Sequence, residues 1–275
     1  MEKKPTFKRA WWKYLIMLLV SALHATPFYV MITMCLKDRT DLSSRWAFPA
    51  TISLDNFVRG WNHANLPLAF KNNIIITVCS SVLIVLIGAF AGYPLARRKT
   101  RLNNTISRLS MGIMMVPPLA ILVPIYSTLS KMHGVSTYWG IIALLVTFNL
   151  PLSIYLFSNF IRSIPSALDE AAEIDGCGYG RAFFKIILPQ LKPVIASVII
   201  MCGLGCWNDY SFSLYVMQSP EKQTLTLVVS SFFSQNDNDL NAAAAVALMA
   251  VAPLIIAYLC LQKYFVQGMV DSAVK

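Results

Sequence analysis

The chain has 275 residues, of which 56% are hydrophobic and only 13% are charged, and its formal net charge is +10. A soluble domain usually has about 25% charged residues, so this composition excludes an ordinary soluble domain and indicates a membrane protein with several spans. The six cysteines form no C-x-x-C pair and lie mostly in apolar segments, which argues against a disulfide framework and a metal site.

Six apolar segments are long enough to cross a bilayer, because a spanning helix needs about 20 mostly apolar residues. These segments lie at about 13–36, 70–95, 106–130, 138–161, 193–217 and 241–262. The first follows a basic start, as a signal peptide does, but it has no convincing small-x-small cleavage site, so we interpret it as a membrane anchor. The sequence therefore predicts an all-α membrane protein with six transmembrane helices in a single domain, residues 1–275.

Lysine and arginine predict the orientation of these helices, because both accumulate in cytoplasmic connections. They are concentrated at the two termini and in the connections after the second and fourth helices: Lys3, Lys4, Lys8, Arg9, Lys13, Arg97, Arg98, Lys99, Arg101, Arg108, Arg162, Arg181, Lys185, Lys192, Lys263 and Lys275. We therefore expect both termini and these two connections to be cytoplasmic. The basic excess is then a signal of topology and does not indicate nucleic-acid binding.

Prolines interrupt several of the predicted helices. The simplest interpretation is a tolerated kink, because neighbouring groups can bond to the freed carbonyls. The alternative is a broken helix that lines a pathway, and the segment from Pro117 to Pro124 is its strongest candidate.

A connection rich in charged and small residues separates the fourth and fifth helices. It contains "LDEAAEIDGCGYGRAFFKIILPQLKP", residues 168–193. Ser166 and Asp169 have the spacing of a hydroxyl cap and a first-turn acid, which predicts a helix over about 167–175. Gly176 should end this helix, since glycine readily adopts the left-handed conformation. A glycine-rich turn then leads to a second short helix that Pro189 should stop.

The first of these short helices has a thin face and a charged face. Ala171 and Ala172 keep one face thin, while Glu170, Glu173 and Asp175 supply the charge. Such a helix fits a groove on a soluble partner. An ordinary solvated amphipathic loop is an equally good interpretation of these residues alone.

The same stretch resembles the cytoplasmic EAA loop of the permeases of ABC importers. The loop has the pattern E-A-A, three residues, Gly, nine residues and I-x-L-P, which here reads Glu170-Ala171-Ala172, Gly176 and "IILP" at 186–189. Segments such as "FKNNIIITVCSSVLIVLIGAFAGYPLARRK" extend the resemblance over most of the chain, to the smaller permease of maltose-type carbohydrate importers. The tail "DSAVK" departs from the "GAVKG"-like ending that is usual there. The resemblance implies these ATPase-coupling residues: Glu170, Ala171, Ala172, Asp175, Gly176, Leu188 and Pro189.

The resemblance also implies partners. This chain would pair with a second homologous permease in the lipid of a bacterial plasma membrane, a dimer of ATPase subunits would bind the loop, and an extracellular solute-binding protein would deliver a sugar. The sequence has no G-x-x-x-x-G-K-[ST] phosphate loop. We therefore expect no enzymatic activity and no cofactor in this chain, with ATP and Mg²⁺ bound by the partner ATPase.

A polar and aromatic cluster in the fifth predicted helix is a candidate for the translocation pathway: Trp207, Asn208, Asp209 and Tyr210. Sugars stack on aromatic rings and bond to amides and carboxylates, and an acid inside a membrane is expensive enough to suggest a function. The cluster also lies near the outer edge of the bilayer core, where Trp and Tyr are common in any case. Asn149, in the fourth helix, is a further candidate.

Two alternative functions remain open from the sequence. A permease of the same type for a polyol, glycerol phosphate or an amino acid would carry the same EAA loop, because the loop contacts the ATPase and not the cargo. An ion-coupled secondary transporter usually has more buried acids or histidines and often an inverted repeat, so it is less favoured. A membrane enzyme would need paired carboxylates, metal-spaced histidines or a nucleophile elbow, and the sequence has none.

Overall fold

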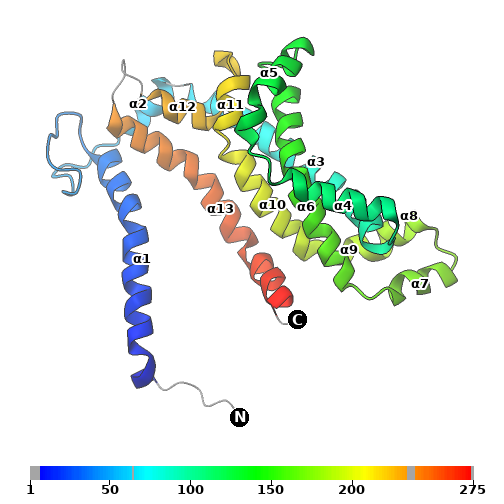
Figure 1. Cartoon of the computed structure of the whole chain (residues 1–275). Coiled ribbons are helices and arrows are strands. Elements are labelled where there is room, and N and C mark those ends of the chain that lie inside the picture. The colour runs from blue at the N-terminus through cyan, green and yellow to red at the C-terminus, as the bar shows by residue number, and fades with distance from the viewer. Residues whose placement is uncertain (1–6, 64, 234–238, 274–275) are drawn as a thin grey trace. The chain divides into compact units, whose positions relative to one another are not determined.

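The computed structural model describes residues 7–63, 65–233 and 239–273. Every regular element in these ranges is a helix, which confirms the predicted all-α class (Figure 1). By their internal contacts the helices form two compact units. Of the described residues, the first comprises 7–63, 65–66, 229–233 and 239–251, and the second comprises 67–228 and 252–273.

The first unit contains α1 (Phe7–Leu36), α2 (Asp55–His63) and the beginning of α13 (Leu240–Ala273). Asn56 on α2 holds the end of α1, because its side-chain amide donates to the carbonyls of Cys35, at 2.9 Å, and Lys37, at 2.6 Å. The last carbonyls of a helix have no donor within the helix, so this amide satisfies groups that would otherwise be unpaired.

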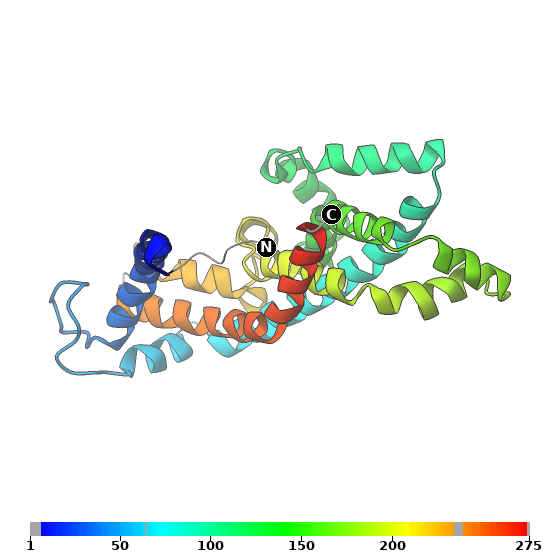
Figure 2. The ribbon, with the colours of Figure 1, turned by 90° about the horizontal axis from the view of Figure 1, so that it is seen from below.

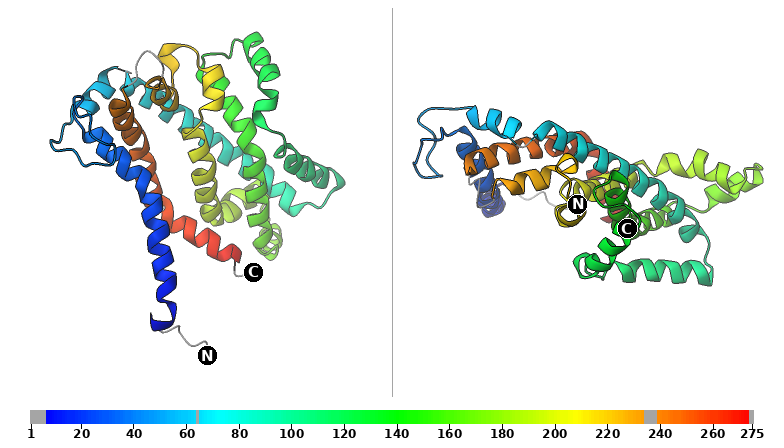
Figure 3. Two further views of the ribbon diagram at one scale, coloured as in Figure 1. Left: turned by 60° about the vertical axis from the view of Figure 1, so that its left-hand side comes forward. Right: turned by 90° about the horizontal axis from the view of Figure 1, so that it is seen from above.

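The second unit contains the remaining long helices. These are α3 (Leu66–Arg97), α4 (Arg101–Ile113), α5 (Leu122–Lys131), α6 (Tyr138–Ser163) and α10 (Lys192–Trp207). Short helices connect them: η1 (Pro118–Ile121), α7 (Ala167–Ile174), α8 (Tyr179–Ala182), η2 (Phe183–Ile187), α9 (Leu188–Gln190), α11 (Ser211–Val216), η3 (Pro220–Lys222) and α12 (Leu225–Ser231). Helices α6 and α10 lie side by side (Figures 1 and 3), and both contribute fully buried side chains to one apolar core.

Close approach of α3 and α6 depends on glycine. A Cβ atom added to Gly88 would lie 2.0 Å from Oγ of Ser153, and one added to Gly92 would lie 2.8 Å from Cβ of Phe157. The Ser153 hydroxyl also donates to the carbonyl of Ile84 on α3, at 3.0 Å. Small residues of this kind permit helices to pack by van der Waals contact where lipid removes the hydrophobic driving force.

Four of the six predicted spans correspond to continuous helices. Among the described residues, the helices long and apolar enough to cross a membrane are Trp11–Leu36, Leu66–Arg97, Tyr138–Ser163 and Leu240–Cys260. The other two spans are bent pairs of helices: Arg101–Ile113 with Pro118–Lys131, and Tyr179–Gln190 with Lys192–Trp207. Counting each pair as one span restores the predicted number of six.

The segment predicted as one span over about 106–130 is not a single straight helix, and the alternative of a broken helix near Pro117 holds. Helix α4 ends at Ile113, and the chain turns by 95° before it continues into α5. Two consecutive prolines explain the break. The helical conformation is disfavoured for a residue that precedes a proline, and Pro117 adopts an extended backbone, with φ of −62° and ψ of 121°, before Pro118.

The prediction of one helix over 193–217 is wrong, because α10 ends at Trp207 and α11 begins only at Ser211. Nor does Pro189 stop the second short helix of the connection, which runs on to Gln190. Before this proline the helix widens into a π turn, in which the N–H of Leu188 donates to the carbonyl of Phe183. A proline clashes with the carbonyl four residues before it in an α-helix, and the wider turn relieves that clash.

We expect Gly88→Ala to destabilise the protein and Gly112→Ala to leave it unchanged. The added methyl at Gly88 meets Ser153, which cannot turn away without losing its bond to Ile84, whereas none of the described atoms lies within 4 Å of the same position at Gly112. Overpacking of this kind costs about 1–3 kcal/mol. Thermal unfolding of the detergent-solubilised protein measures the difference, and equal melting temperatures for the two variants would contradict the predicted packing.

Candidate functional site

The connection between α6 and α10 leaves through α7 and returns through α8 and α9 (Figures 1 and 2). Helix α7, Ala167–Ile174, confirms the helix predicted for this stretch. Gly176 follows with a φ of +72°, so glycine ends the helix as expected. None of the described atoms lies within 4 Å of a Cβ placed on Gly176. The position therefore requires glycine for its backbone conformation and not for lack of space.

The start of α7 differs from the prediction. Within the described chain the Ser166 side chain makes no capping hydrogen bond, so the expected hydroxyl cap is wrong. Ser166 itself has a helical backbone, and its carbonyl accepts from the N–H groups of Asp169, at 2.9 Å, and Glu170, at 3.1 Å. The side chain of Asp169 is then used elsewhere, in a contact with α3.

Helix α7 has one face turned toward its own chain and one turned outward. Ala172 is only 2% exposed, and Asp169, three residues before it, is on the same inward face. Glu170 and Glu173 are exposed, and Ile174 is 86% exposed. The outward face of α7 therefore carries acids and one large apolar side chain. The sequence interpretation missed Ile174, although its spacing of four from Glu170 places it on the same face.

The other predicted coupling residues divide between these two environments. Ala171, Asp175, Gly176 and Pro189 are exposed. Leu188 is partly buried and packs against the core of the second unit. The exposed members, together with Glu170 and Ile174, are the ones available to a partner.

Asp169 joins α7 to the end of α3. The hydroxyl of Tyr93 donates to one carboxylate oxygen at 2.5 Å, and Nε of Arg97 lies 2.8 Å from the other. Arg97 also donates from Nη1 to the carbonyl of Ile164, the residue that ends α6, at 2.9 Å. The Arg97 side chain is only 13% exposed, so water screens this ion pair less than a surface pair.

Aromatic rings join the returning arm of the connection to the same end of α3. The ring of Tyr179 stacks on Tyr93 at 4.6 Å between centroids, and the guanidinium of Arg98 lies 4.5 Å from the centre of the Tyr179 ring. Phe183 packs on Tyr93 at 5.1 Å. The sequence interpretation used Arg97 and Arg98 only as signals of topology and did not assign these contacts.

The predicted pathway cluster lies at the break between α10 and α11. The carboxylate of Asp209 accepts from the backbone N–H groups of Phe212, at 3.3 Å, and Ser213, at 2.9 Å, and from the Ser213 hydroxyl, at 2.8 Å. Asp209 therefore caps α11. Asn208 and Tyr210 are exposed on either side of it.

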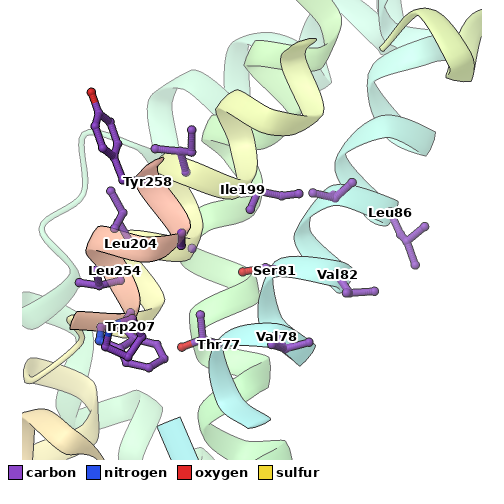
Figure 4. A pocket seen from close by; sticks show the side chains of 15 residues that line it. Thr77, Val78, Ser81, Val82, Leu86, Ile199, Leu204, Trp207, Leu254 and Tyr258 are labelled. Carbon is purple, nitrogen blue, oxygen red and sulfur yellow. The ribbon is translucent and has the colours of Figure 1, made fainter. Parts of the chain in front are cut away.

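Trp207 ends α10 and lines an apolar pocket of about 520 Å³. The walls of the pocket come from α3, α10 and the later part of α13, Pro253 to Tyr258. Thr77 and Ser81 on α3 direct their hydroxyls toward this space, opposite Trp207 and Leu204 (Figure 4). Asn149 contributes to another contact, since its Oδ1 lies 3.7 Å from a Cβ placed on Gly205 of α10.

The opposite end of α3 is also held by hydrogen bonds. The buried amide of Asn72 donates to the carbonyls of Glu221, at 3.0 Å, and Gln223, at 2.9 Å, and accepts from the hydroxyl of Tyr138, at 2.6 Å. Asn73 donates to the carbonyl of Trp207 at 3.2 Å. These bonds fix the connection after α11 against α3 and the start of α6.

Comparisons with known proteins agree with this arrangement. The family model described as "Binding-protein-dependent transport system inner membrane component" matches residues 84–271. The chain is 43% identical to the melibiose/raffinose/stachyose import permease MelC of Bacillus subtilis, over 95% of both chains. It is 34% identical to the multiple sugar-binding transport permease MsmG of Streptococcus mutans, over 96% of both.

The fold resembles that of a chain in the crystal structure of a bacterial ABC transporter that imports the acidic polysaccharide alginate. The TM-score is 0.80 at 19% identity, and the match covers 96% of this chain and 99% of the other. The family match extends over more than half of the chain, and it describes a transport component of a membrane and not an enzyme. The chain belongs to the family of binding-protein-dependent transport system inner membrane components.

Proposed function

We propose that this chain is one permease subunit of an ATP-driven carbohydrate importer. The observation that carries the proposal is α7: its inward face is anchored to α3, and its outward face exposes Glu170, Glu173 and Ile174. The names of the relatives, which import melibiose, raffinose, stachyose or several sugars, support a carbohydrate as the cargo.

Three kinds of partner complete the importer. A second homologous permease forms the other half of the translocation pathway, and a dimer of ATPase subunits binds the outward face of α7. An extracellular solute-binding protein delivers the sugar. A related alginate transporter has been solved in complex with a periplasmic protein bound to an alginate pentasaccharide, which supports this third partner. ATP and Mg²⁺ bind to the ATPase subunits, and this chain holds no cofactor.

The importer lies in a bacterial plasma membrane with both termini of this chain in the cytoplasm. The basic residues Arg97, Arg98 and Lys99, at the end of α3 beside α7, support a cytoplasmic position for the coupling connection. The connection fixed by Asn72 then lies on the outer side, toward the solute-binding protein.

Transport proceeds by alternating access. Closure of the ATPase dimer displaces α7, and the attached helices reorient so that the pathway opens outward. Trp207 lines the pathway, while Asn208, Asp209 and Tyr210 form the break that follows it, and Asn149 lies across from α10. The carboxylate of Asp209 is occupied by the backbone of α11, so its contribution is to shape this break.

Affinity purification of the tagged chain from its own membranes tests the proposal. We expect an ATPase and a second permease to co-purify, with ATP hydrolysis that a sugar-loaded binding protein stimulates. Stimulation by a polyol, glycerol phosphate or amino acid instead would move the assignment to another cargo. A chain that purifies alone from transporting membranes, with uptake that resists ATP depletion but not an uncoupler, would replace the proposal with ion-coupled transport.

The conformation of Gly176 gives a sharper prediction. Gly176→Val should abolish transport, as should Glu170→Lys on the docking face, while the complex stays in the membrane. A left-handed backbone costs roughly 1–2 kcal/mol for an ordinary residue, and more for a β-branched one, while asparagine tolerates it better. Gly176→Asn should therefore retain more transport than Gly176→Val. Gly178→Ala is the matched control, since Gly178 has a φ of −64° and space around it; equal uptake by all four variants would refute the coupling role.

The pathway assignment predicts different effects at adjacent residues. Trp207→Ala removes a ring from the pocket wall and should raise KM for sugar uptake several-fold, whereas Asp209→Asn keeps a capping oxygen and should leave KM nearly unchanged. Asp209→Ala removes the cap and should cost about 1 kcal/mol of stability. Uptake kinetics in vesicles measure the first two variants. Normal kinetics for Trp207→Ala would remove Trp207 from the pathway.

A further inference from the structure

Helix α7 is joined to its neighbours by short links that lie outside the regular helices. Ile164, Pro165 and Ser166 precede it, and Asp175 to Gly178 separate it from α8. A rigid displacement of α7 would therefore be absorbed by rotation about these links if the chain connection were its only attachment. Something other than the backbone has to hold α7 for its motion to reach a transmembrane helix.

The only polar side-chain contacts on the inward face of α7, within the described residues, go to α3. Asp169 accepts from Tyr93 at 2.5 Å and pairs with Arg97 at 2.8 Å. Arg97 extends the contact to the end of α6 by donating to the Ile164 carbonyl. One guanidinium thus bridges the last turn of α3, the residue directly after α6 and the first turn of α7.

The part of the connection that returns through α8 also contacts the end of α3, and this contact is made by aromatic side chains. Tyr179 is inserted between the Tyr93 ring and the Arg98 guanidinium, at 4.6 Å and 4.5 Å. Both arms of the connection therefore converge on the end of α3, Tyr93 to Arg97, and on Arg98 directly after it. Both oxygens of Asp169 are in contact with α3, one through the hydrogen bond from Tyr93 and the other through the partly buried ion pair with Arg97. Partial burial strengthens the attraction of this pair.

We propose that Arg97, assisted by Tyr93, is a positioning residue that makes α7 and α3 move as one body. The inference rests on the proposed function, in which an ATPase displaces α7. In this proposal the displacement of α7 reaches the membrane-spanning helices through α3. If the chain connection alone carried the displacement, it would reach them through α6 and α10. Breaking the Arg97–Asp169 pair then uncouples ATP hydrolysis from transport while leaving the docking face of α7 intact.

The first test measures sugar transported per ATP hydrolysed by the reconstituted complete transporter. We expect Arg97→Gln and Asp169→Asn to lower this ratio about tenfold, with the ATPase still bound and hydrolysis within about twofold of the native value. The double exchange Arg97→Asp with Asp169→Arg should recover part of the ratio. Lys99→Gln is the matched control. Lys99 lies two residues after Arg97, its side chain is exposed and outside the contact, and the exchange removes the same charge.

Tyr93→Phe covers the case in which the Arg97 variants fail to assemble. It removes one donor from Asp169 but keeps the ring that packs on Tyr179, so it should assemble normally and lower the ratio less than Arg97→Gln. An unchanged ratio in both Tyr93→Phe and Arg97→Gln would overturn the proposal. So would a loss in Lys99→Gln as large as that in Arg97→Gln, because the effect would then follow charge alone.

A distance measurement separates this inference from the proposed function. Spin labels on the native Cys177, beside α7, and on Leu86→Cys of α3, in a chain whose other cysteines are replaced, report how firmly the two elements are joined. We expect one narrow distance distribution with and without ATP in the native background, and a broad one in Arg97→Gln. A native distance that changes with ATP would overturn the rigid link. If no ATPase co-purified at all, the proposed function would fail, while the nucleotide-free comparison would still report the link.

Discussion

The arrangement of this permease depends on a carboxylate that α7 directs inward. Asp169 sits where a first-turn acid would ordinarily face solvent and the helix dipole, yet its two oxygens are taken by Tyr93 and Arg97 of α3. Because these groups are partly buried, the attraction between them is stronger than at an open surface. The inward carboxylate leaves Glu170, Glu173 and Ile174 exposed on the opposite face of α7. In the proposed importer the two faces of this eight-residue helix have different roles, because one attaches it to α3 and the other binds the ATPase.

Backbone hydrogen bonding decides where the remaining elements end. In lipid every N–H and carbonyl must be satisfied within the protein, so a break in a helix needs substitutes close at hand. At the end of α10 the substitutes are Asp209, which accepts from the first turn of α11, and Asn73, which donates to the carbonyl of Trp207. At Pro189 no external group is needed, because the π turn at Phe183–Ile187 redistributes the bonds within the helix. Asp209 and Asn73 therefore act here as hydrogen-bond partners of backbone groups at a helix break.

Much of the fold could be predicted from the sequence, for identifiable reasons. Hydropathy locates all six apolar segments, and the pairing of a helical stretch with Gly176 locates α7 almost to the residue. Hydropathy carries no direction, however, so the 95° turn after α4 could not be predicted, although the prolines from Pro117 mark this segment as a candidate for a broken helix. The contact of Tyr93 with Asp169 joins residues 76 positions apart, and no local pattern contains it. The position of Ile174 on the same face as Glu170 could have been predicted, because the helical period alone places the two residues side by side.

Helix α3 is bonded through Asn72 near one end and Arg97 at the other, and this has a consequence for how the gene can change. A helix advances by about 100° and 1.5 Å per residue. Inserting or deleting a single residue between these two positions would turn one end by more than a quarter of a circle relative to the other. Either the Asn72 amide or the Arg97 guanidinium would then face away from its partners. The number of residues between the two bonded ends should therefore stay constant among related chains.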